Sequence, residues 1–146
     1  MNIELRTAPF EPLAELARYQ AGLDNHQRSQ YGAAAIFIGT MRDANDGEWV
    51  RGMTLEHYPG MTERQLQRIV ESAFHQWPLL DALVMHRVGA LQPNDPIVLI
   101  AVWAERRATA FAACRFLIEE LKSTAPFWKR EDTAAGAHWV EHNTPG

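Results

Sequence analysis

Apolar residues recur every three or four positions in some stretches of the chain and form short continuous or alternating runs in others. The clearest helical pattern follows Thr62, with apolar side chains at Leu66, Ile69, Val70, Ala73, Phe74 and Trp77. We expect Thr62 to cap this helix, with Gln65 completing a capping box, and Pro78 to end it.

Two other helices are predicted from the same periodicity. The first begins near Pro12 and ends by Gly22, and the last runs from about Arg106 to Lys122. The predicted buried face of the last helix comprises Phe111, Cys114, Leu117, Ile118 and Leu121. The polar residues 24–30 predict a loop.

Short apolar runs predict the strands, at residues 3–6, 32–40, 50–58, 82–88 and 97–104, and in a hairpin of residues 127–131 and 137–141 around residues 134–136. Residues 32–40 are nearly all apolar, so we expect a buried strand there. The strand at 50–58 follows closely, which suggests that these two strands pair in antiparallel fashion. The order of elements predicts one α+β domain over residues 1–146, with helices packed on a mostly antiparallel sheet.

Composition narrows the class of protein. The chain has 146 residues and a formal net charge of −4, which argues against a general nucleic-acid binder because such proteins need a basic face. The single cysteine, Cys114, cannot form an internal disulfide. No signal peptide and no apolar run of membrane-spanning length is visible, so we expect a cytoplasmic protein that does not contact a membrane. The six histidines do not cluster at ligand spacing, so we expect no metal and no cofactor.

The stretch from Leu121 to Glu131 is the strongest candidate for chemistry. Lys122 lies at the predicted helix exit, and Lys129 follows Pro126, Phe127 and Trp128. Because Pro126 forces a turn, both ammonium groups could meet in one pocket, where apolar surroundings would lower a lysine pKa. The alternative is that Lys122 only complements the helix dipole and that Lys129 and Arg130 form a solvated strand end.

Several arginines stand at the ends of predicted elements. Arg42 follows an apolar strand, and Arg106 and Arg107 lie where another strand gives way to a helix. Arginines at such positions can bind phosphate or carboxylate through two parallel hydrogen bonds, and free amides at the helix start would help. The alternative is that each arginine faces water, and the spacing alone leaves open whether they meet.

Four stretches of the chain resemble the catalytic (large) subunit of molybdopterin synthase. They are Gly32 and Ala33 with Phe37, Gly39 and Arg42; residues 55–61 (Leu-Glu-His-Tyr-Pro-Gly-Met); residues 86–89 (His-Arg-Val-Gly); and Leu121 and Lys122 with residues 125–131 (Ala-Pro-Phe-Trp-Lys-Arg-Glu). The second and fourth are long and specific, and the resemblance covers most of the chain.

The resemblance implies a sulfurtransferase of molybdenum cofactor biosynthesis. Such an enzyme converts cyclic pyranopterin monophosphate to molybdopterin by inserting two dithiolene sulfurs. The sulfur arrives as a thiocarboxylate on the C-terminal glycine of a small ubiquitin-like sulfur-carrier subunit. The resemblance also implies a homodimer of the large subunit within a heterotetramer, and an α/β hammerhead fold with an added antiparallel β subdomain.

The resemblance assigns roles to particular residues. Lys122 and Lys129 are the implied catalytic lysines, and Thr40, Met41 and Arg42 form the implied substrate loop. The other implied substrate-binding residues are Arg106, Arg107, Arg130 and Glu131. Arg106 stands where the family usually has histidine, so it keeps a cation for phosphate but cannot exchange protons near neutral pH.

Two other classes of function stay open at this stage. The chain could be a non-catalytic module that docks a ubiquitin-like partner, which the change to Arg106 favours and the two lysines oppose. It could also be a small-molecule sensor that uses the anion site.

Overall fold

Two β-sheets form the framework of the chain in the computed structural model, which describes residues 1–45, 48–133 and 136–139. The first sheet has the order β1-β5-β7-β2, and its strands are β1 (Asn2–Arg6), β5 (Leu79–Arg87), β7 (Pro96–Ala104) and β2 (Ala33–Thr40). The β1–β5 pair is parallel, and the other two pairs are antiparallel. The first sheet is therefore mostly antiparallel, as predicted.

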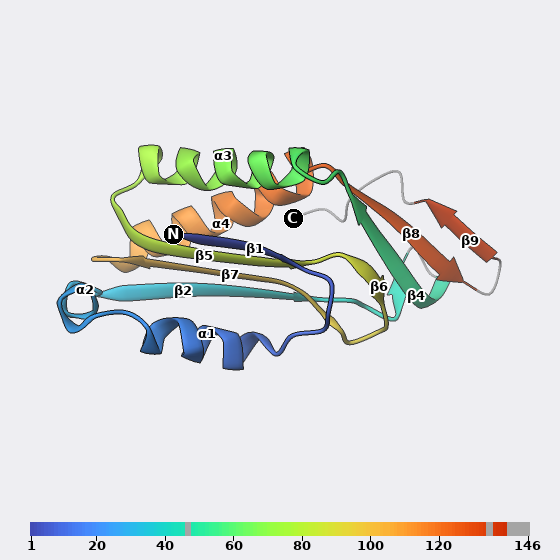
Figure 1. The fold of residues 1–146 in the computed structure, drawn as a ribbon, viewed down its shortest axis with the longest axis horizontal. Helices are drawn as coiled ribbons and strands as arrows, with labels where there is room; N and C mark the ends of the chain where they lie inside the picture. The colour runs from blue at the N-terminus through green and yellow to red at the C-terminus, as the bar shows by residue number, and fades with distance from the viewer. Residues whose placement is uncertain (46–47, 134–135, 140–146) are drawn as a thin grey trace.

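The second sheet lies beyond one end of the first (Figure 1). Its path is β3-β4-β8-β9, and β6 also pairs with β4; the strands are β3 (Ala44–Asn45), β4 (Glu48–His57), β8 (Phe127–Thr133), β9 (Gly136–Trp139) and β6 (Gly89–Leu91). All its pairs are antiparallel. The predicted α+β fold with an added antiparallel β subdomain is confirmed.

Helices cover both faces of the first sheet (Figure 1). The helices are α1 (Pro12–Ala21), α2 (Asn25–Ser29), α3 (Met61–Gln76) and α4 (Arg107–Thr124). The longer pair, α3 and α4, lies on one face, and α1 lies on the other. Because the central strands β5 and β7 are covered on both faces, they are buried continuously from Asp81 to Arg87 and from Val98 to Ala104.

The apolar core has three parts. The largest lies between the first sheet and the α3–α4 layer, and a second, around Trp103 and Phe10, lies under α1. A small third cluster joins the two sheets and contains Met41, Met53, Leu55 and Leu91. This third cluster attaches the β subdomain to the end of the first sheet.

Several local predictions are wrong. The polar stretch 24–30 contains the short helix α2, because the Asp24 side chain accepts a hydrogen bond from the Gln27 backbone amide and the Gln27 side-chain oxygen accepts one from the Asp24 backbone amide. Helix α3 begins at Met61 rather than after a Thr62 cap, and the Glu63 carboxylate, not Gln65, accepts a hydrogen bond from the Gly60 amide.

Strand pairing and burial also differ from the prediction at β2. This strand pairs with β7, not with β4, because the loop after β2 carries the chain into the second sheet. As an edge strand it is only half covered, and Ile36 and Ile38 are 45% and 37% exposed. On α4, Phe111 is 68% exposed rather than buried.

The predicted C-terminal hairpin agrees with the structure within its described part. The hairpin of β8 and β9 is present, although residues 134–135 and the predicted strand end at 140–141 lie outside the described residues. No helix within the described ranges is long and apolar enough to cross a membrane. The described residues also contain no group of three or more histidine, cysteine or acidic side chains that could hold a metal ion.

Candidate active site

The turn between α4 and β8 brings two lysines to one place. Lys122 lies in the last turn of α4, which ends at Thr124, and Lys129 is the third residue of β8. Proline cannot continue the helix and disfavours helical backbone at Ala125, which is extended with φ −73° and ψ 133°. The Phe127 amide donates to the Ala125 carbonyl at 2.9 Å, so the chain turns sharply around Pro126.

Lys129 has the electrostatics expected of a functional lysine. Its pKa is lowered to about 8, first by burial and then by the positive charge of Lys122, while Glu131 opposes the shift. The effect of Lys122 on this pKa shows that the two ammonium groups are close. That both lysines serve one functional site stays a prediction, which this proximity supports, and Lys129 can exchange a proton near neutral pH.

These two residues are the only lysines in the chain, whereas arginine occurs twelve times. An arginine stays charged at any physiological pH, but a lysine can lose its proton when it is desolvated. The sequence therefore places its two titratable long-chain cations in one turn. The scarcity of lysine, with both lysines near one turn, is a signal for this site that the individual motifs did not reveal.

His86 belongs to the same site, which sequence reasoning did not predict. Its ring stacks on the Phe127 ring with centroids 4.1 Å apart and planes at 11°. The pKa of His86 is lowered to about 4, mainly by burial and also by the charges of Lys129 and Lys122, against the opposing effect of its hydrogen bond to the Arg87 backbone. The ring is therefore uncharged at neutral pH, and its Nδ1 donates to the Arg87 carbonyl at 2.7 Å, which leaves the lone pair on Nε2.

Pairing with β4 in the second sheet directs the side chains of Lys129 and Glu131 towards the small third cluster. In the β4–β8 ladder, Lys129 lies opposite Leu55 and Glu131 lies opposite Met53. Leu55 and Met53 pack in the small third cluster with Met41. Because opposite residues of a ladder share one face, Lys129 and the buried Glu131 also point to this side.

The predicted substrate loop reaches the same end of the molecule. Met41 is buried in the third cluster, and its amide and carbonyl bond to Asp95 and Asn94. Thr40 and Arg42, on either side of it, are exposed. Thr40 and Arg42 are thus the members of this loop that a ligand can reach, and the Met41 side chain shapes the wall instead.

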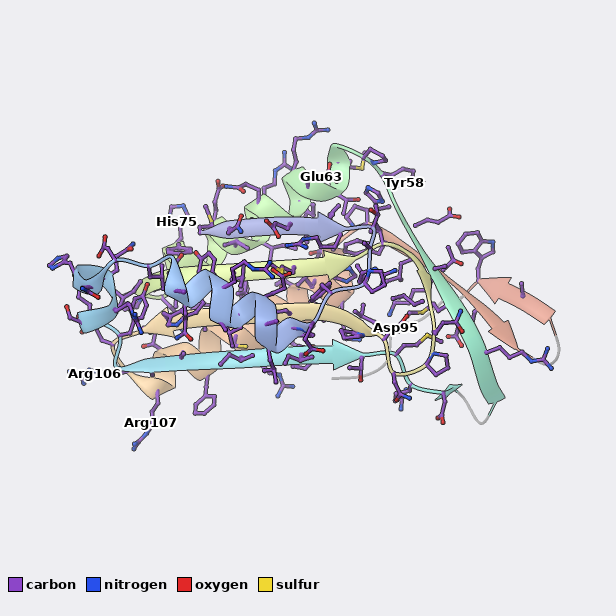
Figure 2. All side chains as sticks on the ribbon, turned by 60° about the horizontal axis from the view of Figure 1, so that its bottom comes forward. Tyr58, Glu63, His75, Asp95, Arg106 and Arg107 are labelled. Carbon is purple, nitrogen blue, oxygen red and sulfur yellow. The ribbon has the colours of Figure 1, made fainter. Side chains whose placement is uncertain are left out.

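Arg106 and Arg107 do not join the lysines of the same chain. Figure 2 shows both arginines at one end of the molecule and Tyr58 and Asp95 far from them, where the two sheets meet. Helix α4 starts at Arg107, and the fifteen residues to Lys122 span about 22 Å at the helical rise. Both arginines are exposed. Arg130 lies in β8, but its side chain is outside the described part of the chain.

Comparison with known proteins shows which family this arrangement belongs to. A sequence model of the MoaE protein family matches residues 8–124. A molybdopterin synthase catalytic subunit from Ralstonia nicotianae is 55% identical over 140 residues, covering 96% of this chain and 77% of the relative. The chain belongs to the MoaE family, the catalytic subunits of molybdopterin synthase.

Solved structures agree with this assignment. A molybdopterin biosynthesis MoaE protein from Burkholderia ambifaria has a TM-score of 0.79 and 42% identity, with 99% of this chain and 92% of that chain covered. A more distant structure, at 16% identity and a TM-score of 0.78, covers 97% of this chain and 92% of that one. It is described as a complex of subunits 1 and 2 of molybdopterin-converting factor from Helicobacter pylori, and at this identity it shows the fold alone. This MoaE-family chain is therefore an enzyme of molybdenum cofactor biosynthesis.

Proposed function

We propose that the chain catalyses the sulfur transfer that converts cyclic pyranopterin monophosphate to molybdopterin. In this proposal, residues 1–146 act as one domain in the cytosol and need no metal or cofactor. A small ubiquitin-like subunit delivers each sulfur as a thiocarboxylate on its C-terminal glycine. The observation that carries the proposal is the pair of adjacent lysines with the Lys129 pKa lowered to about 8.

The two lysines have different roles in this mechanism. Lys122 contacts the thiocarboxylate carbonyl and can form a transient amide with it, in which a carbon–nitrogen bond replaces the carbon–sulfur bond and the sulfur leaves towards the pterin. Water then hydrolyses the amide and restores Lys122. Lys129 stabilises the negative charge that develops and moves a proton at the pterin, which a group with a pKa near 8 does well.

The anionic ends of both reactants match the charge of the site. The substrate phosphate and the thiocarboxylate are attracted to a place that holds two ammonium groups and the exposed Arg42. Thr40, Met41, Arg130 and Glu131 are the further substrate-binding residues of this proposal. Glu131 keeps Lys129 charged more often than burial alone would allow, because its charge raises the Lys129 pKa.

A second copy of the chain completes the site in this proposal. Arg106 and Arg107 lie about one α4 length from Lys122 of their own chain, so in this proposal they reach a bound phosphate from a partner copy. The exposed apolar side chains of Ile36, Ile38 and Phe111 offer a surface for that contact. The homodimer would thus build each site from two chains, and Arg106 would act as an anion ligand rather than as a proton carrier.

The experiment mixes the purified chain with thiocarboxylated small subunit and cyclic pyranopterin monophosphate and measures molybdopterin. We expect Lys122→Ala to lose sulfur transfer by at least about a hundredfold, because it removes the group that contacts the acyl carbon. The matched control is Arg115→Ala, which removes an exposed cation of the same helix and should keep normal activity.

The outcomes separate the competing functions. Normal transfer by Lys122→Ala would contradict the proposed mechanism. If the wild-type chain binds the small subunit but forms no product, the chain is a docking module, and Arg106→His becomes the informative variant. If the wild-type chain binds the pterin equally well without the small subunit and forms no product, the sensor function is supported instead.

A further inference from the structure

Thr62 is a buried polar residue whose hydroxyl contacts the catalytic turn, although it lies 60 residues before Lys122 in the sequence. It sits in the first turn of α3 and is 0% exposed. Its backbone amide donates to the Tyr58 carbonyl at 2.9 Å, and its Oγ1 accepts a hydrogen bond from the Tyr58 amide at 3.0 Å. Oγ1 in turn donates to the Pro126 carbonyl at 3.2 Å.

The Pro126 carbonyl belongs to the peptide at which the chain changes direction between the two lysines. Pro126 is the corner between α4, which carries Lys122, and β8, which carries Lys129. The orientation of its peptide plane sets the direction in which β8 leaves the turn, and so sets the distance between the two ammonium groups. One side chain of α3 therefore holds the corner on which the separation of the lysines depends.

The other contacts of this corner do not replace the hydroxyl. Phe127 is fixed by its stack on His86 and by its pairing with His57 of β4. The stack and the pairing hold the residue after the corner. The corner peptide itself is held by two hydrogen bonds, from the Phe127 amide to the Ala125 carbonyl within the turn and from the Thr62 hydroxyl to the Pro126 carbonyl, and of these two the Thr62 bond ties the corner to α3. A hydroxyl is needed there because it both accepts from Tyr58 and donates to Pro126, and no apolar side chain can do either.

We propose that Thr62 is a positioning residue of the two-lysine site, which fixes the separation of Lys122 and Lys129 through its hydrogen bond to the Pro126 carbonyl. The part of this inference that concerns turnover rests on the proposed sulfur transfer. The part that concerns the lysines does not, because their proton equilibria can be measured on the chain alone.

The test uses two substitutions that change opposite halves of the threonine side chain. Thr62→Val keeps the shape and removes the hydroxyl, whereas Thr62→Ser keeps the hydroxyl and leaves a methyl-sized gap in a fully buried place. A purely structural role predicts that both variants lose thermal stability and that neither alters the chemistry. A positioning role predicts that only Thr62→Val alters the site.

The first measurement is an NMR titration of lysine side chains labelled with ¹³C at Cε. The two lysine signals can be assigned with Lys122→Arg, because the chain has only two lysines. In the wild type we expect Lys129 to titrate near pH 8. In Thr62→Val a looser turn admits water and separates the charges, so its pKa should rise towards the ordinary 10.5, while Thr62→Ser should titrate like the wild type.

The second measurement is sulfur transfer with the complete set of reactants. Thr62→Val should lower kcat by about ten- to a hundredfold, the usual effect of misplacing a catalytic group by about 1 Å, with little change in KM. The kcat of Thr62→Ser should stay within about threefold of the wild-type value, because the hydroxyl still holds the catalytic lysines in place.

Each outcome decides one part of the inference. If Thr62→Val folds and both its lysine titration and its kcat match the wild type, the positioning role is overturned. If Thr62→Ser loses kcat as severely as Thr62→Val, the buried methyl and not the hydroxyl matters, which also overturns it. If the wild type transfers no sulfur but Thr62→Val shifts the Lys129 titration, the proposed function fails and the positioning of the lysines stands.

Discussion

At the scale of single residues, the protonation of Lys129 is the property most open to measurement. Its pKa near 8 means that it loses its charge within an accessible pH range. If Lys129 acts as a cation, the rate of sulfur transfer should fall as pH rises through about 8. The measurement is kcat against pH. Lys129→Arg should have a lower kcat because arginine cannot move the proton, but the remaining rate should not decline through about pH 8 because arginine stays charged. An unchanged decline in Lys129→Arg would show that another group causes it.

His86 makes a separate prediction about stability at low pH. Its pKa is about 4 in the folded chain and about 6.5 in an unfolded one, so between these values the unfolded chain binds a proton that the folded chain does not. The free energy of unfolding should therefore decrease as pH falls through this window, by about 3 kcal/mol in total. Urea unfolding at pH 4.5 and pH 7 measures the loss.

Substitution tests whether His86 causes this loss. His86→Gln should flatten the pH dependence, whereas His75→Gln, on the exposed surface of α3, should leave it unchanged. Equal slopes in the His86→Gln variant and the wild type would assign the acid sensitivity to other groups.

The sequence alone was enough to single out the two lysines as candidates, but not the residues that surround them in the fold. Pro126 and the two aromatic residues after it were enough to predict a turn between Lys122 and Lys129. His86 and Thr62 reach that turn from β5 and α3, through a ring stack and a hydrogen bond across the fold. Contacts between residues so far apart in sequence leave no periodic pattern, so sequence reasoning placed His86 on a strand and Thr62 at a helix cap.

At the scale of elements, the chain just before β2 approaches the chain just before α4 so closely that Gly32 should not tolerate a larger residue. A Cβ added to Gly32 would lie 1.9 Å from the Glu105 carbonyl oxygen, which is backbone and cannot move aside cheaply. Gly32→Ala should therefore destabilise the fold by about 1–3 kcal/mol or more. The comparison is Gly22→Ala, where the nearest atom is 3.5 Å away, the backbone is helical and little loss is expected. Thermal unfolding of both variants measures the difference, and equal melting temperatures would contradict it.

Helices and strands could be predicted where the buried residues follow the helical or strand period of the sequence. The pairing of the strands could not be predicted in this way. On α3, the apolar residues Leu66, Ile69, Val70 and Ala73 face the core as their spacing indicates. The apolar run in β2 also reads as buried, yet one face of this edge strand is open, as is Phe111 on α4. The spacing of apolar residues indicates which side chains are kept from water. It does not indicate whether the residues that bury them belong to the same chain or to another copy.

At the scale of the whole molecule, a shared site predicts complementation between two inactive variants. If Lys122 of one copy works with Arg107 of another, Lys122→Ala and Arg107→Ala should each be inactive alone. A mixed dimer then contains one intact site, so an equimolar mixture allowed to exchange should recover about a quarter of the wild-type activity. No recovery, with exchange verified by mass spectrometry, would place both residues in one chain's site.

The alternating side-chain directions of β8 also limit how its length can change. Lys129 and Glu131 face the core side of the β subdomain because they lie opposite Leu55 and Met53. One residue inserted between Pro126 and Lys129 would turn both side chains to the opposite face, whereas an insertion beyond β8 would leave their orientation intact. Among natural homologues, gains and losses of single residues should therefore be rare between the two lysines and tolerated in the β8–β9 connection.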